Sequence, residues 1–339
     1  VQMKAVAYYQ SLPSSDPHSL QDLELPAPTP GPRDLLVAVR AISVNPVDTK
    51  IRRNVAPADG QAKVLGWDVA GVVQAVGSEV SLFQVGDEVF YAGALQRQGG
   101  NSELHVVDER IVGHKPRSLG FAEAAALPLT AITAWELLFE RLKIAEGSAS
   151  SGQSLLIIGA AGGVGSILTQ LARQLTGLTV IGTASRPETA DWVKQLGAHH
   201  VLDHSQPLLP QLQQLGIQQV NHVASLTHTD QHYDQLIEAL APQGQLALID
   251  DPAQLDVVKL KRKSLSLHWE FMYTRSLFET PDMQAQHALL ERVAQLIDAG
   301  TLRTTLGEHF GSINASNLRR AHALLESGKA RGKIVLEGF

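Results

Sequence analysis

The clearest candidate for chemistry in this sequence is a glycine-rich turn, GAAGGVG, at residues 159–165. The turn follows a continuous apolar strand pattern at 154–160 and precedes a helical pattern that runs from Gly163 to Leu175. A strand, a glycine-rich turn and a helix in this order are typical of dinucleotide-binding sites. Gly162 would let the backbone approach a pyrophosphate, and Gly165 would let the helix pack closely on the strand.

Seven residues of this turn are predicted to bind the cofactor, because the free N–H groups at the start of a helix hold phosphates well. They are Gly159, Ala160, Ala161, Gly162, Gly163, Val164 and Gly165. Ala160 replaces the first glycine of the usual fingerprint, a departure that such a turn tolerates. The alternative is a glycine turn that holds no ligand.

The end of the next predicted strand, 179–184, indicates which dinucleotide binds. NAD sites usually place Asp or Glu there, on the ribose hydroxyls. Here Ser185 and Arg186 follow the strand, and a hydroxyl with a guanidinium suits a 2′-phosphate better than a diol. We therefore expect NADPH. Glu188 is interpreted as a charge in the first turn of a helix, and the alternative for Arg186 is a solvated surface residue.

The composition excludes several other classes of function. A net charge of −6 over 339 residues gives no basic face for a nucleic acid, and the length favours two domains. The absence of cysteine excludes disulfides, thiolate nucleophiles and zinc sites built on sulfur. No apolar stretch approaches a membrane span, and the N-terminus lacks a signal-peptide pattern, so a cytoplasmic protein without membrane contact is expected.

The organisation of the chain predicts one domain inserted into another. Short strand patterns fill the first 127 residues, and they are predicted at 34–44, 68–77, 86–93 and 102–113. Two helices follow within 121–142, separated at Pro128.

Strands and helices then alternate, as in a parallel sheet that is covered on both faces. The strands are predicted at 154–160, 179–184, 200–204, 220–226, 244–250 and 265–272, with helices from Pro187 to near Gly197 and at 230–241. After two further helices (282–299 and 314–328), a last strand at 333–338 must pair back in the first domain. We expect a catalytic domain of 1–127 plus 278–339 and a nucleotide-binding domain of 128–277, with Trp135 and Trp269 in the core.

The sequence resembles the medium-chain dehydrogenase/reductases, in particular their zinc-free quinone oxidoreductase (zeta-crystallin-like) branch. GQSLLIIGAAGGVGSILTQLAR (152–173) matches the motif of that branch, and the resemblance extends over the whole chain through ISVNPVDTKIR (42–52), VGDEVF (85–90), AAALPLTAITAWELL (124–138) and GKARGKIVL (328–336). It implies an α/β fold in which a doubly wound, parallel Rossmann sheet is inserted into a GroES-like β-barrel domain, which agrees with the insertion deduced above.

The zinc enzymes of this superfamily use residues that this chain lacks. Their first zinc-binding cysteine corresponds to Asn45, and the histidine of their Gly-His-Glu motif corresponds to Trp67. Among the 13 histidines, only His199 and His200 are adjacent, and neighbours at the start of a strand point to opposite faces. The sequence therefore predicts no metal site, and Trp67 is expected to fill the vacated space and wall the substrate cleft; the alternative is a core side chain.

Without a Lewis acid, oxidation of an alcohol is disfavoured, whereas a quinone or a conjugated enone accepts hydride readily. The resemblance implies that Asn45 and Asp48 line the cleft beside the nicotinamide. Asn45 would donate a hydrogen bond to the oxygen of the acceptor, and Asp48 would orient Asn45 or a water molecule. The alternative for Asp48 is a cap of the turn after Pro46.

Further cofactor contacts are also implied by the resemblance. Thr130 corresponds to a threonine near the nicotinamide carboxamide, or else it is a plain helix N-cap. His204 follows the third strand of the nucleotide-binding domain, where related enzymes place an aromatic residue against the adenosine phosphate; the alternative is a surface histidine. Lys329, Arg331 and Lys333 could reach the cofactor phosphates, although at least two of them are expected to be surface charges.

The function expected from these residues is reduction of quinones or α,β-unsaturated carbonyl compounds by NADPH without metal, in a homodimer. Two alternatives keep the fold: a zinc-dependent alcohol dehydrogenase, and a non-catalytic protein that binds the cofactor, as lens crystallins do.

Overall fold

The computed structural model describes residues 1–339 and divides into two compact units. Unit 1 contains Val1–Ile132 and Tyr273–Phe339, and unit 2 contains Thr133–Met272. The crossings predicted from the sequence, near 127/128 and 277/278, lie about five residues away from those in the structure. The first crossing falls inside a helix, α3, so no loop marks it in the sequence.

Unit 1 is built mainly from short strands. These are β1 (Gln2–Tyr8), β2 (Gln21–Pro26), β3 (Asp34–Ser43), β4 (Lys63–Val64), β5 (Val69–Val76), β6 (Glu88–Tyr91), β7 (Leu104–Asp108), β8 (Val112–His114), β15 (Leu306–His309) and β16 (Lys333–Glu337). Its helices are α1 (Pro46–Asn54), α2 (Phe121–Ala125), α3 (Pro128–Trp135, which crosses into unit 2), α8 (Thr274–Leu277), α9 (Ala285–Asp298) and α10 (Ala315–Glu326), with a 3₁₀ turn η1 (Glu109–Ile111).

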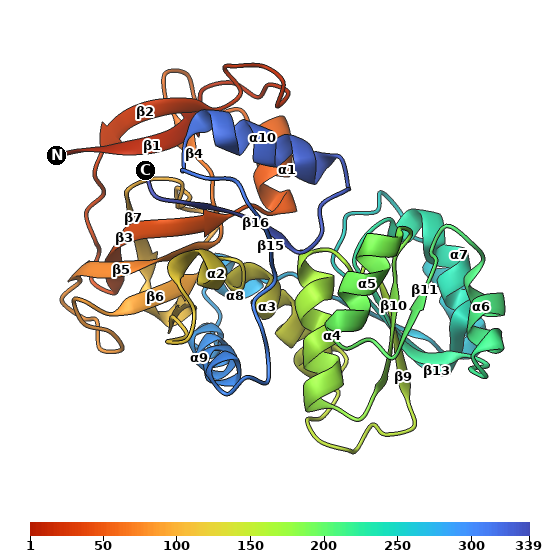
Figure 1. Ribbon diagram of the computed structural model, residues 1–339. Coiled ribbons are helices and arrows are strands. Elements are labelled where there is room, and N and C mark those ends of the chain that lie inside the picture. Colours follow the sequence, from red (N-terminus) through yellow and green to blue (C-terminus); the bar gives the residue numbers. More distant parts are fainter. The chain divides into compact units, whose positions relative to one another are not determined.

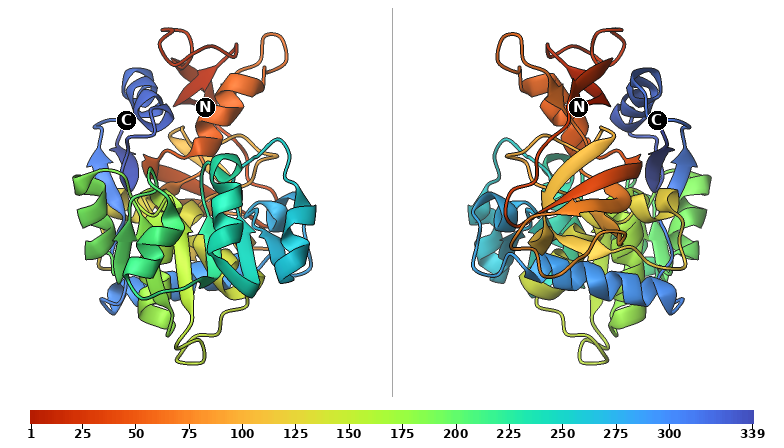
Figure 2. Two further views of the ribbon diagram at one scale, coloured as in Figure 1. Left: turned by 90° about the vertical axis from the view of Figure 1, so that its right-hand side faces the viewer. Right: turned by 90° about the vertical axis from the view of Figure 1, so that its left-hand side faces the viewer.

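Two sheets form unit 1. The larger has the order β15-β16-β3-β5-β6-β8, with β7 also paired to β3, and the smaller has the order β2-β1-β4. The final strand, β16, pairs antiparallel with β3, which confirms that the chain returns to its first domain. Both termini therefore belong to this unit, and both views of Figure 2 place them at the same end of it.

The single strand predicted at 102–113 is wrong, because the 3₁₀ turn η1 divides it into β7 and β8. The turn is held by Glu109, whose buried carboxylate accepts hydrogen bonds from the backbone of Ser81 and Leu82 and from Arg33. Alternating apolar residues continue through the turn, so the sequence pattern alone does not reveal this break.

The expectation that no apolar stretch approaches a membrane span is wrong, because one helical stretch, residues 121–141, is long and apolar enough to cross a membrane by length and composition. Its most apolar window is 78% buried inside the protein, as in the core helix of a globular fold. The stretch consists of α2, α3 and a π-helical turn, η2 (Glu136–Arg141).

Unit 2 alternates strands with helices. Its strands are β9 (Ser154–Ile158), β10 (Thr179–Thr183), β11 (His200–Leu202), β12 (Val220–Ser225), β13 (Leu240–Leu248) and β14 (Ser266–Trp269). Its helices are α4 (Gly163–Leu175), α5 (Pro187–Gln195), α6 (Leu208–Gln214) and α7 (Thr229–Ala239), with a 3₁₀ segment η3 (Val257–Lys263).

All six strands of unit 2 are parallel, in the order β11-β10-β9-β12-β13-β14. Helices α4 and α5 lie on one side of this sheet and α6 and α7 on the other (Figure 1). The strand order reverses between β9 and β12, and ligands of open α/β sheets bind beside such a switch point, at the carboxyl ends of the strands. This confirms the predicted Rossmann architecture, in which β9 leads directly into the glycine-rich turn.

Candidate functional site

The glycine-rich turn has the geometry of a dinucleotide site. Gly159 directly follows β9 and has a φ of +83°, a conformation that favours glycine, and its N–H donates to the hydroxyl of Thr183 at 3.2 Å. Gly162 is the N-cap of α4, so the helix begins at Gly163 as predicted. The first N–H groups of α4 therefore face the end of β9, where an anionic pyrophosphate is stabilised.

Gly162 and Gly165 differ in the space around them. A Cβ on Gly165 would lie 2.4 Å from the carbonyl oxygen of Gly159 and 2.6 Å from backbone atoms of Ala160, because α4 packs tightly against the turn. A Cβ on Gly162 would meet nothing closer than the Gly159 oxygen at 3.5 Å. Gly165 is thus required by packing within the protein, whereas nothing in the protein requires a glycine at 162. The open space at Gly162 is where a pyrophosphate would approach, so the residues of this turn fit the cofactor.

The residues after β10 are positioned by the start of α5. Arg186 is the N-cap of this helix and Ser185 is exposed beside it. The Arg186 guanidinium makes an ion pair with Glu188 at 3.1 Å, and both side chains are partly exposed. Glu188 is therefore not only a charge in the first helical turn, as the sequence suggested, but also a partner that a 2′-phosphate on Arg186 would have to displace.

In unit 1, four polar side chains meet in a buried cluster, which we call the Asp68 cluster: Ser43, Asn45, Asp68 and Lys333. Oδ2 of Asp68 accepts from the Ser43 hydroxyl at 2.8 Å, from Nδ2 of Asn45 at 2.8 Å and from the Lys333 ammonium at 2.9 Å. Oδ1 accepts from the backbone N–H of Leu129 at 2.8 Å, at the start of α3. The buried carboxylate thus has four donors, which satisfies it well.

Three paired strands bring this cluster together. Ser43 ends β3, Asp68 precedes β5 and Lys333 begins β16, and β3 pairs with both of the other strands. Asn45 follows as the N-cap of α1. Lys333 also donates to Oδ1 of Asn45, so the amide of this 1% exposed residue is fixed at both ends.

Asp48 lies beside this cluster as the third residue of α1. Its Oδ2 accepts the backbone N–H of Asn45 at 2.8 Å in a capping box, which is the capping alternative of the sequence analysis. Oδ1 makes no hydrogen bond of normal geometry, although the Gly66 backbone amide stabilises the charged form. Burial raises the pKa of Asp48 to about 7, in spite of the opposing effects of Asn45 and Lys333.

Trp67 is a core side chain with 1% of its surface exposed, so the core alternative describes it better than a wall of an open cleft. Its indole N–H donates to the carbonyl of Ala94 at 3.3 Å. The ring lies 3.8 Å from the position that a Cβ on Gly93 would take. The indole at this position is therefore packed into the core of unit 1.

The remaining predicted site residues differ in burial and in hydrogen-bond partners. The buried hydroxyl of Thr130 donates to the Leu127 carbonyl at 3.3 Å, inside the helix and not as an N-cap. His204 is half-buried after β11. Lys329 and Arg331 are exposed, whereas Lys333 is 3% exposed and turned into the Asp68 cluster.

Ser43 and Tyr273 also belong to this region and are not predicted from the sequence. Tyr273 is buried, and burial together with the charges of Asp48 and Asp68 raises the pKa of its hydroxyl well above the usual value. No motif marks either residue, because strand pairing and the return of the chain from unit 2 bring them to this place.

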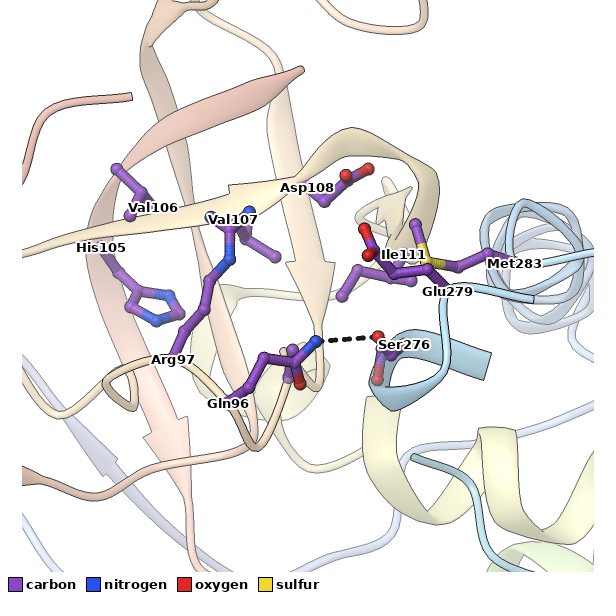
Figure 3. A pocket seen from close by; sticks show the side chains of 11 residues that line it. Gln96, Arg97, His105, Val106, Val107, Asp108, Ile111, Ser276, Glu279 and Met283 are labelled. Carbon is purple, nitrogen blue, oxygen red and sulfur yellow. Dashed lines mark hydrogen bonds between the residues drawn. The ribbon is translucent and has the colours of Figure 1, made fainter. Parts of the chain in front are cut away.

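A small pocket in unit 1 lies between the β6–β7 connection and the segment 276–283 (Figure 3). His105 lines it and donates from Nε2 to the Gln98 carbonyl at 2.9 Å, so its Nδ1 accepts from the Tyr91 hydroxyl at 2.8 Å. Burial lowers the pKa of His105 to about 4, which keeps the ring neutral. None of the predicted site residues lines this pocket.

The residues of unit 1 do not fit a catalytic zinc. Asn45 and Trp67 stand where the resemblance places two ligands of the zinc enzymes, and no cysteine is present in the chain. No group of three or more His, Asp and Glu side chains is placed to hold a metal ion. The Lys333 ammonium already donates to Asn45 and Asp68, so a cation occupies the polar end of this cluster.

Family models match both parts of the chain. The model described as "Alcohol dehydrogenase GroES-like domain" matches residues 31–135, and the model described as "Zinc-binding dehydrogenase" matches residues 196–336. A "Zinc-type alcohol dehydrogenase-like protein" of Staphylococcus aureus is 41% identical over 336 residues, which cover 98% of this chain and 99% of that protein. A "Quinone oxidoreductase" of Pseudomonas aeruginosa is 34% identical over 313 residues, covering 91% of this chain and 92% of the relative.

Solved structures agree with these matches. A "putative zinc-dependent alcohol dehydrogenase protein" from Rhizobium etli is 56% identical, with a TM-score of 0.96 and coverage of 100% of this chain and 99% of the other. A mycobacterial protein complexed with NADPH is 27% identical, with a TM-score of 0.84 and 99% coverage of both chains. This chain belongs to the medium-chain dehydrogenase/reductase superfamily and is a nicotinamide-dependent oxidoreductase with a GroES-like domain and an inserted Rossmann domain.

Proposed function

We propose that this enzyme reduces quinones or α,β-unsaturated carbonyl compounds with NADPH and without a metal. The observation that carries the proposal is the Asp68 cluster, in which the ammonium of Lys333 bonds Asn45 and Asp68. Trp67, next to Asp68 in the sequence, is a buried core side chain and offers no metal ligand. Related proteins named quinone oxidoreductase support the substrate class. The names of other relatives contain the word zinc, but the residues of this chain argue against that chemistry.

In the proposed reaction, the chain supplies binding and orientation. NADPH, when bound, supplies the hydride. The N–H groups at the start of α4 hold the pyrophosphate, with Gly162 leaving room for it. Quinones and conjugated carbonyls are already electron-poor, so alignment and one hydrogen-bond donor suffice.

Asn45 is the donor that the proposal assigns to the acceptor oxygen. Its Nδ2 gives one hydrogen to Asp68, and Lys333 fixes its carbonyl end, so the second hydrogen points in a fixed direction. Asp48 holds the backbone N–H of Asn45 and has a pKa near neutrality, so it is the group beside Asn45 that gains or loses a proton at working pH.

The preference for NADPH is supported by Ser185 and Arg186 after β10, where an acidic residue would favour NADH. Structure neighbours complexed with NADPH are consistent with it. Replacing Arg186 by Ala should weaken NADPH binding more than NADH binding, and equal losses would refute the assignment.

A homodimer is also proposed. Strand β14 forms an edge of the six-stranded sheet, and the aromatic side chains of Trp269 and Phe271 beside it are 53% and 48% exposed. The expectation that Trp269 lies in the core is therefore wrong. An unpaired strand edge with exposed aromatic side chains favours association, and light scattering after size-exclusion chromatography should give twice the mass of the chain.

The reaction class is tested by following NADPH oxidation with a panel of acceptors. We expect turnover with quinones, enals and enones, and little with saturated aldehydes and ketones. Turnover confined to saturated aldehydes and ketones would contradict the proposal, and stoichiometric zinc in the active protein would favour the alcohol dehydrogenase alternative.

A further inference from the structure

Three histidines of unit 2 come together from two connections of the Rossmann sheet. His204 lies two residues after β11, His228 is the N-cap of α7, and His232 lies in the first turns of that helix. The rings of His204 and His232 are 6.1 Å apart between centroids, at an interplanar angle of 67°. The charge of His228 acts on both of them, so the three form one cluster.

Two of these rings have a buried nitrogen that is left without a partner. Nδ1 of His204 and Nδ1 of His232 are inaccessible to solvent and make no hydrogen bond in the protein. Nδ1 of His228, in contrast, bonds the hydroxyl of Thr227 at 2.8 Å. Buried polar atoms without partners are uncommon in folded proteins, so the protein itself supplies no group that fixes the charge of these two rings.

The two neighbouring carboxylates form hydrogen bonds to residues close to them in the sequence. Oδ1 of Asp203 accepts from the backbone and the hydroxyl of Ser205, at 2.9 and 2.6 Å. Oδ1 of Asp230 accepts from the backbone N–H of Gln231 at 3.0 Å. Neither carboxylate forms an ion pair with the histidines.

The cluster borders the proposed cofactor site. Strand β11 pairs with β10 up to Leu202 and Thr183, so His204 lies just past the end of β10, where the fingerprint places the 2′ position of the ribose. Thr227, next to His228, packs on the glycine turn, since a Cβ on Gly159 would meet its methyl group at 2.9 Å. The cluster therefore faces the adenosine half of a dinucleotide bound at this turn.

We propose that His204, His228 and His232 bind the 2′-phosphate of NADPH and take up a proton from solvent as it binds. This inference depends on the proposed use of NADPH. Arg186 already pairs with Glu188, so the histidines supply the positive charge that this ion pair leaves unavailable.

The physical basis is the charge state of the free protein. Burial lowers the pKa of His204 and of His232, and the neighbouring histidines lower it further, whereas Asp203 and Asp230 raise it. These two rings are thus neutral near pH 7 without ligand. A phosphate group close to the rings favours the imidazolium form, so one imidazole gains a proton and donates a charge-assisted hydrogen bond.

The test is calorimetric titration of the full-length protein with NADPH and with NADH at pH 7, in two buffers of different ionisation enthalpy. We expect NADPH to take up a fraction of a proton, at most about one, and NADH to take up none. The His204→Asn/His232→Asn variant should lose this uptake and bind NADPH about tenfold more weakly, with NADH binding unchanged. The unchanged NADH affinity shows that the variant is folded.

The matched control is His18→Asn, which replaces an exposed histidine of unit 1 and should retain the full uptake. Equal proton uptake for NADPH and NADH, or full uptake in the double variant, would overturn the inference while leaving the proposed function intact. Failure of the unmodified protein to bind NADPH would overturn both, since the cofactor assignment itself would then be wrong.

Discussion

In unit 1 the polar side chains around Asp68 are hydrogen-bond partners of one another. In unit 2, in contrast, two histidines beside the glycine turn each have a ring nitrogen without a partner. Oδ2 of Asp68 has three side-chain donors and Oδ1 has a backbone donor. His204 and His232 each bury an unpartnered nitrogen. A fully satisfied cluster fixes the geometry before any ligand arrives, whereas an unsatisfied cluster gains its partners from the ligand.

The largest expected effect comes from breaking the satisfied cluster. Lys333→Met leaves the Asp68 carboxylate buried without its cation, and such a loss costs about 3–5 kcal/mol. Urea unfolding should show this decrease, and Lys333→Met/Asp68→Asn should recover most of it. Lys329→Met, at an exposed lysine, is the control and should change stability by less than about 0.5 kcal/mol. An equally small effect of Lys333→Met would show that the cluster does not hold unit 1 together.

Acid should destabilise unit 1 through its buried neutral histidines. Burial lowers the pKa of His322 to about 3 and that of His105 to about 4. The unfolded chain binds these protons near pH 6.5, whereas the folded chain does not. The free energy of unfolding is therefore highest above that pH and falls as the pH drops toward 3–4. At pH 5 each of the two histidines lowers the free energy of unfolding by about 2 kcal/mol.

His322→Asn isolates one of these two groups. The amide oxygen of Asn can still accept from Arg52, whose Nη1 lies 2.7 Å from Nδ1 of His322. The free energy of unfolding is measured with urea at pH 7.5 and at pH 5. Between these two pH values, we expect it to fall by about 2 kcal/mol less in the variant than in the unmodified protein. An unchanged acid sensitivity would exclude His322 as a source, and His18→Asn should leave the sensitivity as it is.

Two glycines of the turn separate ligand binding from packing. Gly162→Ala has room for its methyl group inside the protein, so melting should be unchanged while NADPH and NADH bind about tenfold more weakly or worse. Gly165→Ala should instead lower the melting temperature, because its Cβ would collide with backbone. Equal cofactor affinity in Gly162→Ala would argue that no pyrophosphate approaches the turn.

The smallest effect is expected at the ion pair after β10. Glu188→Gln frees Arg186 for the 2′-phosphate, and an exposed ion pair is worth at most about 1 kcal/mol, so NADPH should bind about two- to fivefold more tightly. The NADH affinity should stay constant in the same fluorescence titration. Weaker NADPH binding would mean that Glu188 positions Arg186 and does not compete for it.

The sequence predicted the parts of the molecule that local patterns determine. The glycine spacing at 159–165 and the apolar run before it correctly predicted β9, the turn and the start of α4. The final strand and its return to the first domain were also predicted correctly. Pairings over long sequence distance were not, because Lys333 reaches Asp68 across 265 positions and no local pattern distinguishes it from the exposed Lys329.

The same limit explains the errors. Trp269 is apolar in a strand pattern, but β14 is an edge strand and leaves the ring exposed. The strand predicted at 102–113 is broken by a turn that distant donors to Glu109 stabilise. For Asp48, the structure shows the capping bond to the Asn45 backbone that the sequence analysis kept as an alternative, and its role beside Asn45 stays a prediction.

The most direct test of the account is transfer of deuterium to a conjugated enone from NADPH that carries deuterium at both C4 positions, with protein dialysed against a zinc chelator. The account predicts one deuterium at the β-carbon of the product and a rate unchanged by chelation or by added zinc. Loss of turnover on chelation that added zinc restores would contradict it.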